Sequence, residues 1–283
     1  MYFEFKKKSL KRRSIKFSGE AFMLGAIIGD IAGSKYEWIN IKSKDFEFMD
    51  KECSVTDDSI MSLAVARALV EYRNEGGDLS DRAIAAMQEL GRKYRHAGYG
   101  VMFKKWIDSE NPLPYYSYGN GAAMRVSACG FAATSLDEAK ELSHKVTAVT
   151  HNHPEGLKGA EATAVAIYLA RTGYDIFEIG DYIHENYYEL FFSIDEIRDT
   201  YEFDESCQGT VPQAIMAFLD SNSFEDAIRN AISIGGDSDT IAAIAGGIAE
   251  AYYGIPEDIK TKALTFLDDH LLSIYNDFVK TYM

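Results

Sequence analysis

Apolar side chains recur every three or four positions along most of the chain, the spacing that places them on one face of a helix. Few segments alternate apolar and polar residues as strands do. Residues 57–73 are a clear case of the helical pattern. Residues 21–33 add three glycines that share one helix face, Gly25, Gly29 and Gly33. This spacing predicts that the first helix packs closely against another helix through its small residues.

N-capping residues and prolines predict where further helices begin. Thr56 stands before two acidic residues at the start of one helix, and Pro154 fits the first position of another that runs to residue 171. Three serines are predicted N-caps of further helices: Ser80, Ser135 and Ser223. The other predicted helices cover residues 101–108, 121–133, 175–188, 212–219, 240–253 and the stretch from 256 to the C-terminus. About a dozen helices with short connections predict an all-α fold, a single compact multi-helix bundle.

The charge of the chain is negative overall and unevenly distributed. The 283 residues carry a formal net charge of −15, whereas residues 1–20 hold seven Lys/Arg and two Glu. Proteins that bind nucleic acids generally, through the phosphate backbone, are basic, so no such binding is expected here. The basic start also lacks the apolar segment of a signal peptide. We therefore predict a basic N-terminal extension, residues 1–20, followed by one folded domain, residues 21–283.

The three cysteines are odd in number and widely spaced: Cys53, Cys129 and Cys207. Buried free thiols in a reducing cytoplasm are the simplest interpretation, so a cytoplasmic protein is expected. The sequence has no run of about 20 apolar residues, and no membrane span is expected.

Two acidic clusters are candidates for a metal site. The first is Thr56-Asp57-Asp58, and the second, preceded by two glycines, is Asp237-Ser238-Asp239-Thr240. Hard cations such as Mg²⁺ and Mn²⁺ prefer oxygen ligands, and two clusters would supply a bridged two-metal site if the fold brought them together. The alternative is ordinary helix capping, but the neighbouring acids in both clusters exceed what capping requires.

Three further groups are candidates for binding or catalysis. Residues 117–121 offer glycine-flanked amides to an anion, although Gly-Asn-Gly is also a common turn. His151 and His153 fit metal ligands or acid–base groups, but no cysteine or third histidine is near them in the sequence, so loop and capping roles are the simpler interpretation. Glu37 fits either a general base or a surface charge.

Six segments in order resemble the motifs of the ADP-ribosylglycohydrolase family, which includes the dinitrogenase-reductase-activating glycohydrolases. The segments are GAIIGDIAGSKYE (25–37), TDDS (56–59), GYG (98–100), SYGNGAAMR (117–125), THNHPEG (150–156) and GGDSDTIAAIAG (235–246). Any one of them is common, but six in the family's order with compatible separations are specific. They lie within residues 21–254.

The resemblance implies an all-α orthogonal bundle with a dinuclear Mg²⁺ site in a central cleft, with Mn²⁺ as the alternative ion. The metal ligands would be Thr56, Asp57, Asp58, Asp237, Asp239 and Thr240. The catalytic residues would be Glu37, Asp57 and Asp58. The ADP-ribose would lie along Gly98, Tyr99, Gly100, Ser117, Tyr118, Gly119, Asn120 and His151. Ser59 replaces the threonine of the family's TDDT, beyond the ligand triplet.

The resemblance therefore implies a Mg²⁺-dependent hydrolase that cleaves the glycosidic bond between ADP-ribose and a protein arginine or serine side chain. Its partner would be ADP-ribose or an ADP-ribosylated protein. Two other interpretations stay open: a hydrolase of free ADP-ribosyl metabolites such as O-acyl-ADP-ribose, and a catalytically silent ADP-ribose-binding regulator. Suitable side chains at all six ligand positions argue against the silent regulator. The acceptor, the group that activates water and the oligomeric state stay open.

Overall fold

The computed structural model describes residues 22–283, and the predicted extension, residues 1–20, lies outside the described residues. Regular structure in the described part consists of α-helices and one 3-10 turn, with a single isolated bridge between Gly119 and Ser206. The all-α prediction is therefore confirmed. The helices are α1 (Leu24–Ser34), α2 (Asp57–Glu75), α3 (Leu79–Lys93), α4 (Val101–Ile107), α5 (Ser127–Ala132), α6 (Leu136–Thr147), α7 (Pro154–Arg171), α8 (Ile176–Asn186), α9 (Ile194–Ile197), α10 (Cys207–Leu219), α11 (Phe224–Ser233), α12 (Ser238–Tyr253), α13 (Glu257–Leu264) and α14 (Asp269–Tyr282), and the 3-10 turn η1 is Asn120–Ala122.

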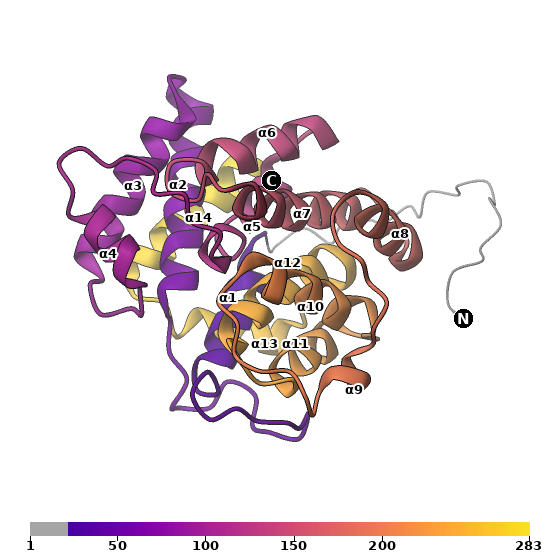
Figure 1. The fold of residues 1–283 in the computed structure, drawn as a ribbon. Coiled ribbons are helices and arrows are strands. Elements are labelled where there is room, and N and C mark those ends of the chain that lie inside the picture. The colour runs from indigo at the N-terminus through magenta and orange to yellow at the C-terminus, as the bar shows by residue number, and fades with distance from the viewer. Residues whose placement is uncertain (1–21) are drawn as a thin grey trace.

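Helices α1 and α12 lie side by side at the centre of the bundle (Figure 1). Helix α12 also packs against α7, α10 and α11, whereas α2 packs against α1, α3 and α14. The contact between α1 and α12 depends on the glycines predicted to lie on one helix face. A Cβ atom at Gly29 would lie 2.0 Å from the carbonyl oxygen of Ala242, and one at Gly25 would lie 2.3 Å from that of Gly246. The two backbones are thus closer than any larger residue allows.

The side chain of Glu250, on α12, caps the N-terminus of α1. The first turn of a helix leaves backbone N–H groups without partners inside the helix. Met23 precedes α1 in a left-handed conformation and offers no side-chain cap. The backbone N–H of Gly25 instead donates to Glu250 Oε2 at 2.7 Å. Glu250 is buried, and burial raises the pKa of its carboxyl group to about 8.

This buried carboxyl group is expected to make the protein less stable as the pH rises from about 4.5 to about 8. The pKa of Glu250 is higher in the folded chain than in the unfolded chain, so folding is linked to proton uptake. Stability is therefore lost as the group ionises. In Glu250→Gln, the fall of the unfolding free energy with pH should be less steep by about 1.4 kcal/mol per pH unit in that window. Urea denaturation at several pH values measures this slope. The matched control is Glu257→Gln, an exposed glutamate on α13. An unchanged slope in Glu250→Gln would contradict the assignment.

Most predicted helix boundaries agree with the structure, and three differ. The N-cap of α3 is Asp78, which accepts from the backbone N–H of Ser80 and Asp81, so the prediction of Ser80 was wrong. Ser80 lies in the first turn and donates to the carbonyl oxygen of Lys145. The predicted helix 121–133 is broken into η1 and α5, and α10 begins at Cys207 rather than at Pro212. For α3 and α10 an earlier N-cap decides the boundary, Asp78 in the first case and Ser206 in the second.

Cys53, Cys129 and Cys207 are buried free thiols, as predicted. Within residues 22–283, no helix combines the length and the apolar character that crossing a bilayer requires.

Candidate active site

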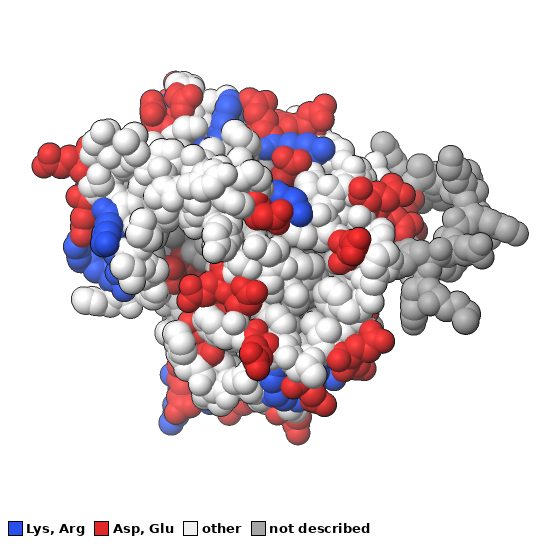
Figure 2. Space-filling model, in the orientation of Figure 1, with Lys and Arg blue, Asp and Glu red and all other residues white. Residues whose placement is uncertain are grey.

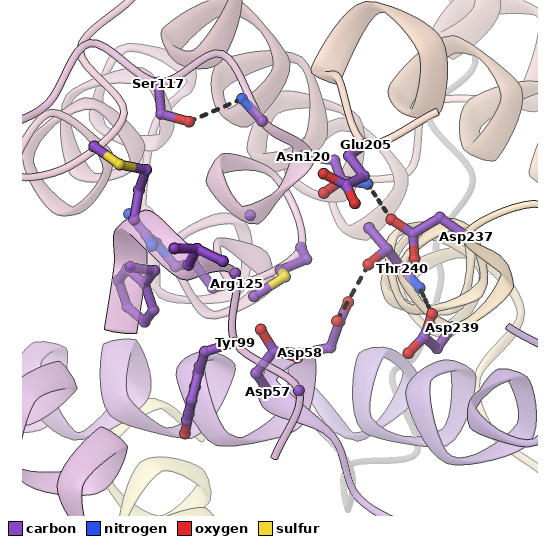
Figure 3. Close-up of a pocket in the computed structure, with 18 of the residues that line it drawn as sticks. Asp57, Asp58, Tyr99, Ser117, Asn120, Arg125, Glu205, Asp237, Asp239 and Thr240 are labelled. Atoms are coloured by element: carbon purple, nitrogen blue, oxygen red, sulfur yellow. Dashed lines mark hydrogen bonds between the residues drawn. The ribbon is translucent and has the colours of Figure 1, made fainter. Parts of the chain in front are cut away.

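The N-termini of α2 and α12 meet at the centre of the molecule and bring the two predicted acidic clusters together. Thr56 is the N-cap of α2, and its side chain accepts from the backbone N–H of Asp58. From the other cluster, the Thr240 hydroxyl donates to Asp58 Oδ2 at 3.2 Å (Figure 3). Two clusters about 180 residues apart in the sequence therefore form one site.

The carboxylates of this site form an acidic floor, defined here as Asp30, Asp57, Asp58, Asp237 and Asp239. One carboxylate oxygen from each of Asp30, Asp58 and Asp239 lies within 4.8 Å of the others. A second group, Glu37, Asp237 and Asp239, meets the same limit. Asp239 belongs to both groups, so it stands between two neighbouring positions that could each hold a cation.

The chemistry of the acidic floor fits divalent metal ions. Burial and the charges of neighbouring carboxylates raise the pKa values of Asp58 and Asp239 well above the usual range. Asp58 Oδ1 is buried and has no hydrogen-bond partner among the described residues. A buried carboxylate oxygen without a partner is costly, and a cation would satisfy it. Oxygen donors from carboxylates and a hydroxyl are the ligands that Mg²⁺ and Mn²⁺ take.

Asp30 is the member of the acidic floor that sequence reasoning missed. It is fully buried on α1, and its carboxylate accepts from the backbone N–H groups of Thr56 and Ser59 and from both of their hydroxyls. This carboxylate therefore fixes the start of α2 against α1. The available signal was a charged residue within the otherwise apolar segment 24–33.

A cavity of about 620 Å³ opens above the acidic floor. Figure 2 shows acidic side chains gathered at a hollow on this face of the molecule. Six carboxylates and one guanidinium line the cavity: Glu37, Asp57, Asp58, Glu205, Asp237, Asp239 and Arg125. Its other lining residues include most of the predicted binding residues: Gly98, Tyr99, Gly100, Ser117, Gly119, Asn120 and His151. The volume is that of a typical small-molecule site.

One wall of the cavity is the loop that ends in η1. The backbone N–H of Asn120 donates to the carbonyl oxygen of Glu205 at 2.7 Å, and that of Cys207 donates to Tyr118 at 2.9 Å. Asn120 Nδ2 also donates to Asp237 Oδ2 at 2.5 Å. These bonds hold the loop against both the start of α10 and the acidic floor. The loop leads into the short turn η1 and not into the long helix that the sequence predicted.

The opposite wall is the segment around Gly98. Only glycine fits at position 98. Gly98 has φ +113°, and a Cβ atom there would lie 2.7 Å from Asp57 Oδ1. The backbone N–H of Asp57 donates to the carbonyl oxygen of Ala97 at 2.7 Å, which ties this segment to the start of α2. Tyr99 follows as a buried ring packed 5.7 Å from the Phe103 ring.

Two predicted site residues do not line the cavity. The Thr56 hydroxyl donates to Asp30 Oδ1 at 2.5 Å, on the side of the acidic floor formed by α1. The side chain of Tyr118 is half exposed, and its ring lies 5.2 Å from that of His153. His153 itself is the N-cap of α7, which confirms the capping interpretation for that histidine.

The mouth of the cavity carries a group of residues of which the sequence revealed only Glu37. We define this rim as Glu37, Trp38, Phe203 and Glu205, all of which line the cavity. The rings of Trp38 and Phe203 stack at 5.5 Å, and 78% of Trp38 is exposed. Burial, followed by the charge of Asp237, raises the pKa of Glu37 to about 7. The rim is thus aromatic and acidic.

The all-α fold and the acidic cavity define the class, a helical protein whose cavity is lined by carboxylates that could hold divalent cations. The model of the ADP-ribosylglycohydrolase family matches residues 18–282, and the chain belongs to this family. It is accordingly a glycosidic-bond hydrolase, as the sequence predicted.

Individual relatives agree with this membership. The ADP-ribosylhydrolase ARH3 of Homo sapiens is 28% identical, with 83% of this chain and 85% of that protein covered. The ADP-ribosyl-[dinitrogen reductase] glycohydrolase of Rhodospirillum rubrum is 27% identical, with 77% and 75% covered. The ADP-ribosylarginine hydrolase Tri1 of Pseudomonas putida is 26% identical, with 82% and 70% covered. A solved structure titled an ADP-ribosylglycohydrolase-related protein complex has the same fold, with a TM-score of 0.68, 22% identity, and 92% of this chain and 96% of that chain covered.

Proposed function

We propose that this enzyme hydrolyses the bond between C1″ of the distal ribose of ADP-ribose and an acceptor on a modified protein. The observation that carries the proposal is the convergence of two acidic helix N-termini at the floor of one cavity. Two Mg²⁺ ions would be held by Asp57, Asp58, Asp237, Asp239, Thr56 and Thr240, with Asp30 supporting the same site. When bound, Mg²⁺ supplies the Lewis acidity that orients hydroxyl groups of the ribose.

The chain's own residues supply the remaining chemistry. Carboxylates of the acidic floor stabilise the positive charge that develops on the ribose as the glycosidic bond breaks. The loop of residues 117–120 and the segment 98–100 form the two walls between which the nucleotide lies. Glu37 is the rim residue that groups with Asp237 and Asp239 of the acidic floor, and at this position it would contact the acceptor atom.

The composition of the rim favours an arginine-linked acceptor over a serine-linked one. An arginine guanidinium leaving from C1″ would meet two carboxylates, Glu37 and Glu205, and the stacked rings of Trp38 and Phe203. A guanidinium over an aromatic face is stabilised electrostatically, whereas a serine hydroxyl gains nothing comparable. The Pseudomonas relative is named an ADP-ribosylarginine hydrolase, which agrees with this assignment.

The decisive experiment measures release of free ADP-ribose from arginine-linked and serine-linked peptides, each with Mg²⁺ and with EDTA. We expect Mg²⁺-dependent release that is faster from the arginine-linked peptide. Trp38→Ala should reduce this preference without abolishing release. O-acetyl-ADP-ribose is included as a free metabolite. Hydrolysis of that compound and of neither peptide would mean that the substrates are free metabolites and not modified proteins. Binding of ADP-ribose without any hydrolysis would indicate a silent regulator.

A further inference from the structure

Arg125 is a buried cation that forms no ion pair in the described part of the chain. It is 1% exposed, lies between η1 and α5, and is the cavity's single lysine or arginine (Figure 3). The titratable groups near it are Tyr115, Cys129 and Cys207, whose pKa values are raised by burial so that they stay neutral, and none is a carboxylate. Its Nε atom has no hydrogen-bond partner, and burial lowers the pKa of the guanidinium to about 10. Burying a cation without an ionic partner is costly, which points to a role that a neutral side chain could not perform.

The guanidinium of Arg125 orients the hydroxyl group of Thr150. Arg125 Nη2 donates to Thr150 Oγ1 at 2.6 Å. An arginine cannot accept a hydrogen bond, so the single hydrogen of the Thr150 hydroxyl must point elsewhere. Two atoms near it can accept this hydrogen: His151 Nδ1, when it carries no proton, at 2.7 Å, and the carbonyl oxygen of Thr147 at 3.4 Å. The distances favour donation to His151 Nδ1.

This hydrogen bond determines the tautomer of His151. In a neutral imidazole, one ring nitrogen accepts and the other carries the proton, so acceptance at Nδ1 places the proton on Nε2. Burial, followed by the charge of Arg125, lowers the pKa of His151 well below its usual value, which keeps the ring neutral. Nε2 faces the backbone of the cavity wall, 3.3 Å from where a Cβ atom of Gly121 would lie. No described residue accepts a hydrogen bond from it, and His151 lines the cavity.

We propose that Arg125 and Thr150 are positioning residues that fix His151 as a neutral imidazole whose Nε2–H serves as a hydrogen-bond donor to a phosphate oxygen of a nucleoside-diphosphate sugar. Arg125 adds a fixed positive charge behind this donor, in a cavity whose other charged groups are all carboxylates. The identity of the ligand rests on the proposed function, whereas the tautomer does not.

The tautomer is tested in the ¹⁵N-labelled protein without ligand, by long-range ¹H–¹⁵N correlation of the imidazole rings. We expect the proton on Nε2 of His151 in the wild type and in Thr150→Ser, which keeps the hydroxyl. Thr150→Val, which is similar in size, should give a mixture of tautomers. His153 is the internal control, because its Nδ1 accepts from the backbone N–H of Glu155 and does not depend on Thr150. A proton on Nδ1, an imidazolium, or an unchanged spectrum in Thr150→Val would overturn the relay.

Binding of ADP-ribose, measured by calorimetry, tests the donor role. Thr150→Val should weaken binding about tenfold, the scale of one hydrogen bond to a charged group, and Thr150→Ser should bind within about twofold of the wild type. Equal affinities in Thr150→Val and the wild type, with the tautomer altered, would overturn the donor role. No binding of ADP-ribose to the wild type, with the tautomer as expected, would instead overturn the proposed function and leave the relay supported.

Discussion

Asp239→Asn is expected to reduce hydrolysis of ADP-ribosylated peptides by about 10³-fold or more. Asp239 contributes to both groups of carboxylates in the acidic floor, so the substitution weakens both cation positions at once. Bound metal ions supply several kcal/mol to reactions of this kind, and each 1.4 kcal/mol corresponds to tenfold in rate. The measurement is initial-rate release of ADP-ribose in saturating Mg²⁺. Full activity in this variant, or in Asp57→Ala, would contradict a metal-centred mechanism.

The same substitution separates a metal site from a structural acidic cluster. Asparagine keeps the acceptor for the backbone N–H of Thr240, which Asp239 Oδ1 binds at 3.0 Å, and removes a charge from among buried carboxylates. We therefore expect the melting temperature of Asp239→Asn in EDTA to equal or exceed that of the wild type. Mg²⁺ should raise the melting temperature of the wild type by mass action and leave the variant nearly unchanged. Asp258→Asn, at an exposed position on α13, is the matched control and should behave as the wild type in both assays.

Gly29→Ala is expected to destabilise the fold by about 3 kcal/mol or more. The added methyl group would lie 2.0 Å from the Ala242 carbonyl oxygen, a backbone atom that moves only if α1 and α12 separate. Overpacking of a tight core costs about 1–3 kcal/mol, and backbone-to-backbone collisions lie at or beyond the upper end. The measurement is the free energy of unfolding from urea denaturation.

The matched control for this substitution is Gly180→Ala. Gly180 also lies within a helix, but a methyl group there meets only the end of the Leu219 side chain, at 3.3 Å. Alanine is the better helix former, so this variant should be as stable as the wild type or up to about 1 kcal/mol more stable. If Gly29→Ala were equally stable, the two central helices would have to pack less closely than the structure describes.

The sequence predicted those features that short segments encode. The apolar spacing of residues 57–73, the cap at Thr56 and the glycine face of residues 21–33 each depend on neighbours within a turn or two, and the structure agrees with all three. Asp78 and not Ser80 caps α3. In the sequence, the two residues are equivalent as candidate caps, and only the folded structure shows that the Ser80 hydroxyl donates to the carbonyl oxygen of Lys145. Such a choice depends on tertiary contacts that no local pattern contains.

The candidate site could be predicted in part, for the same physical reason. Acidic clusters at two helix starts are visible as motifs, and the structure brings them together. Asp30 and Arg125 gain their roles only from partners elsewhere, Thr56 with Ser59 in one case and Thr150 in the other. Trp38 and Phe203 are unremarkable in the sequence and form a rim only because two loops meet at the mouth of the cavity. Long-range contacts of this kind are set by the packing of the helices.

The bond between Gly25 and Glu250 joins residues that are 225 positions apart. A ribosome that synthesises the chain from its N-terminus therefore releases α1 long before the helix against which it packs has been made. Asp237 and Asp239 arrive with that same late helix, so the acidic floor is complete only when most of the chain has been translated. Assembly of the central helix pair must wait until α12 has been made, and the apolar residues of α1 stay without their partner helix until then.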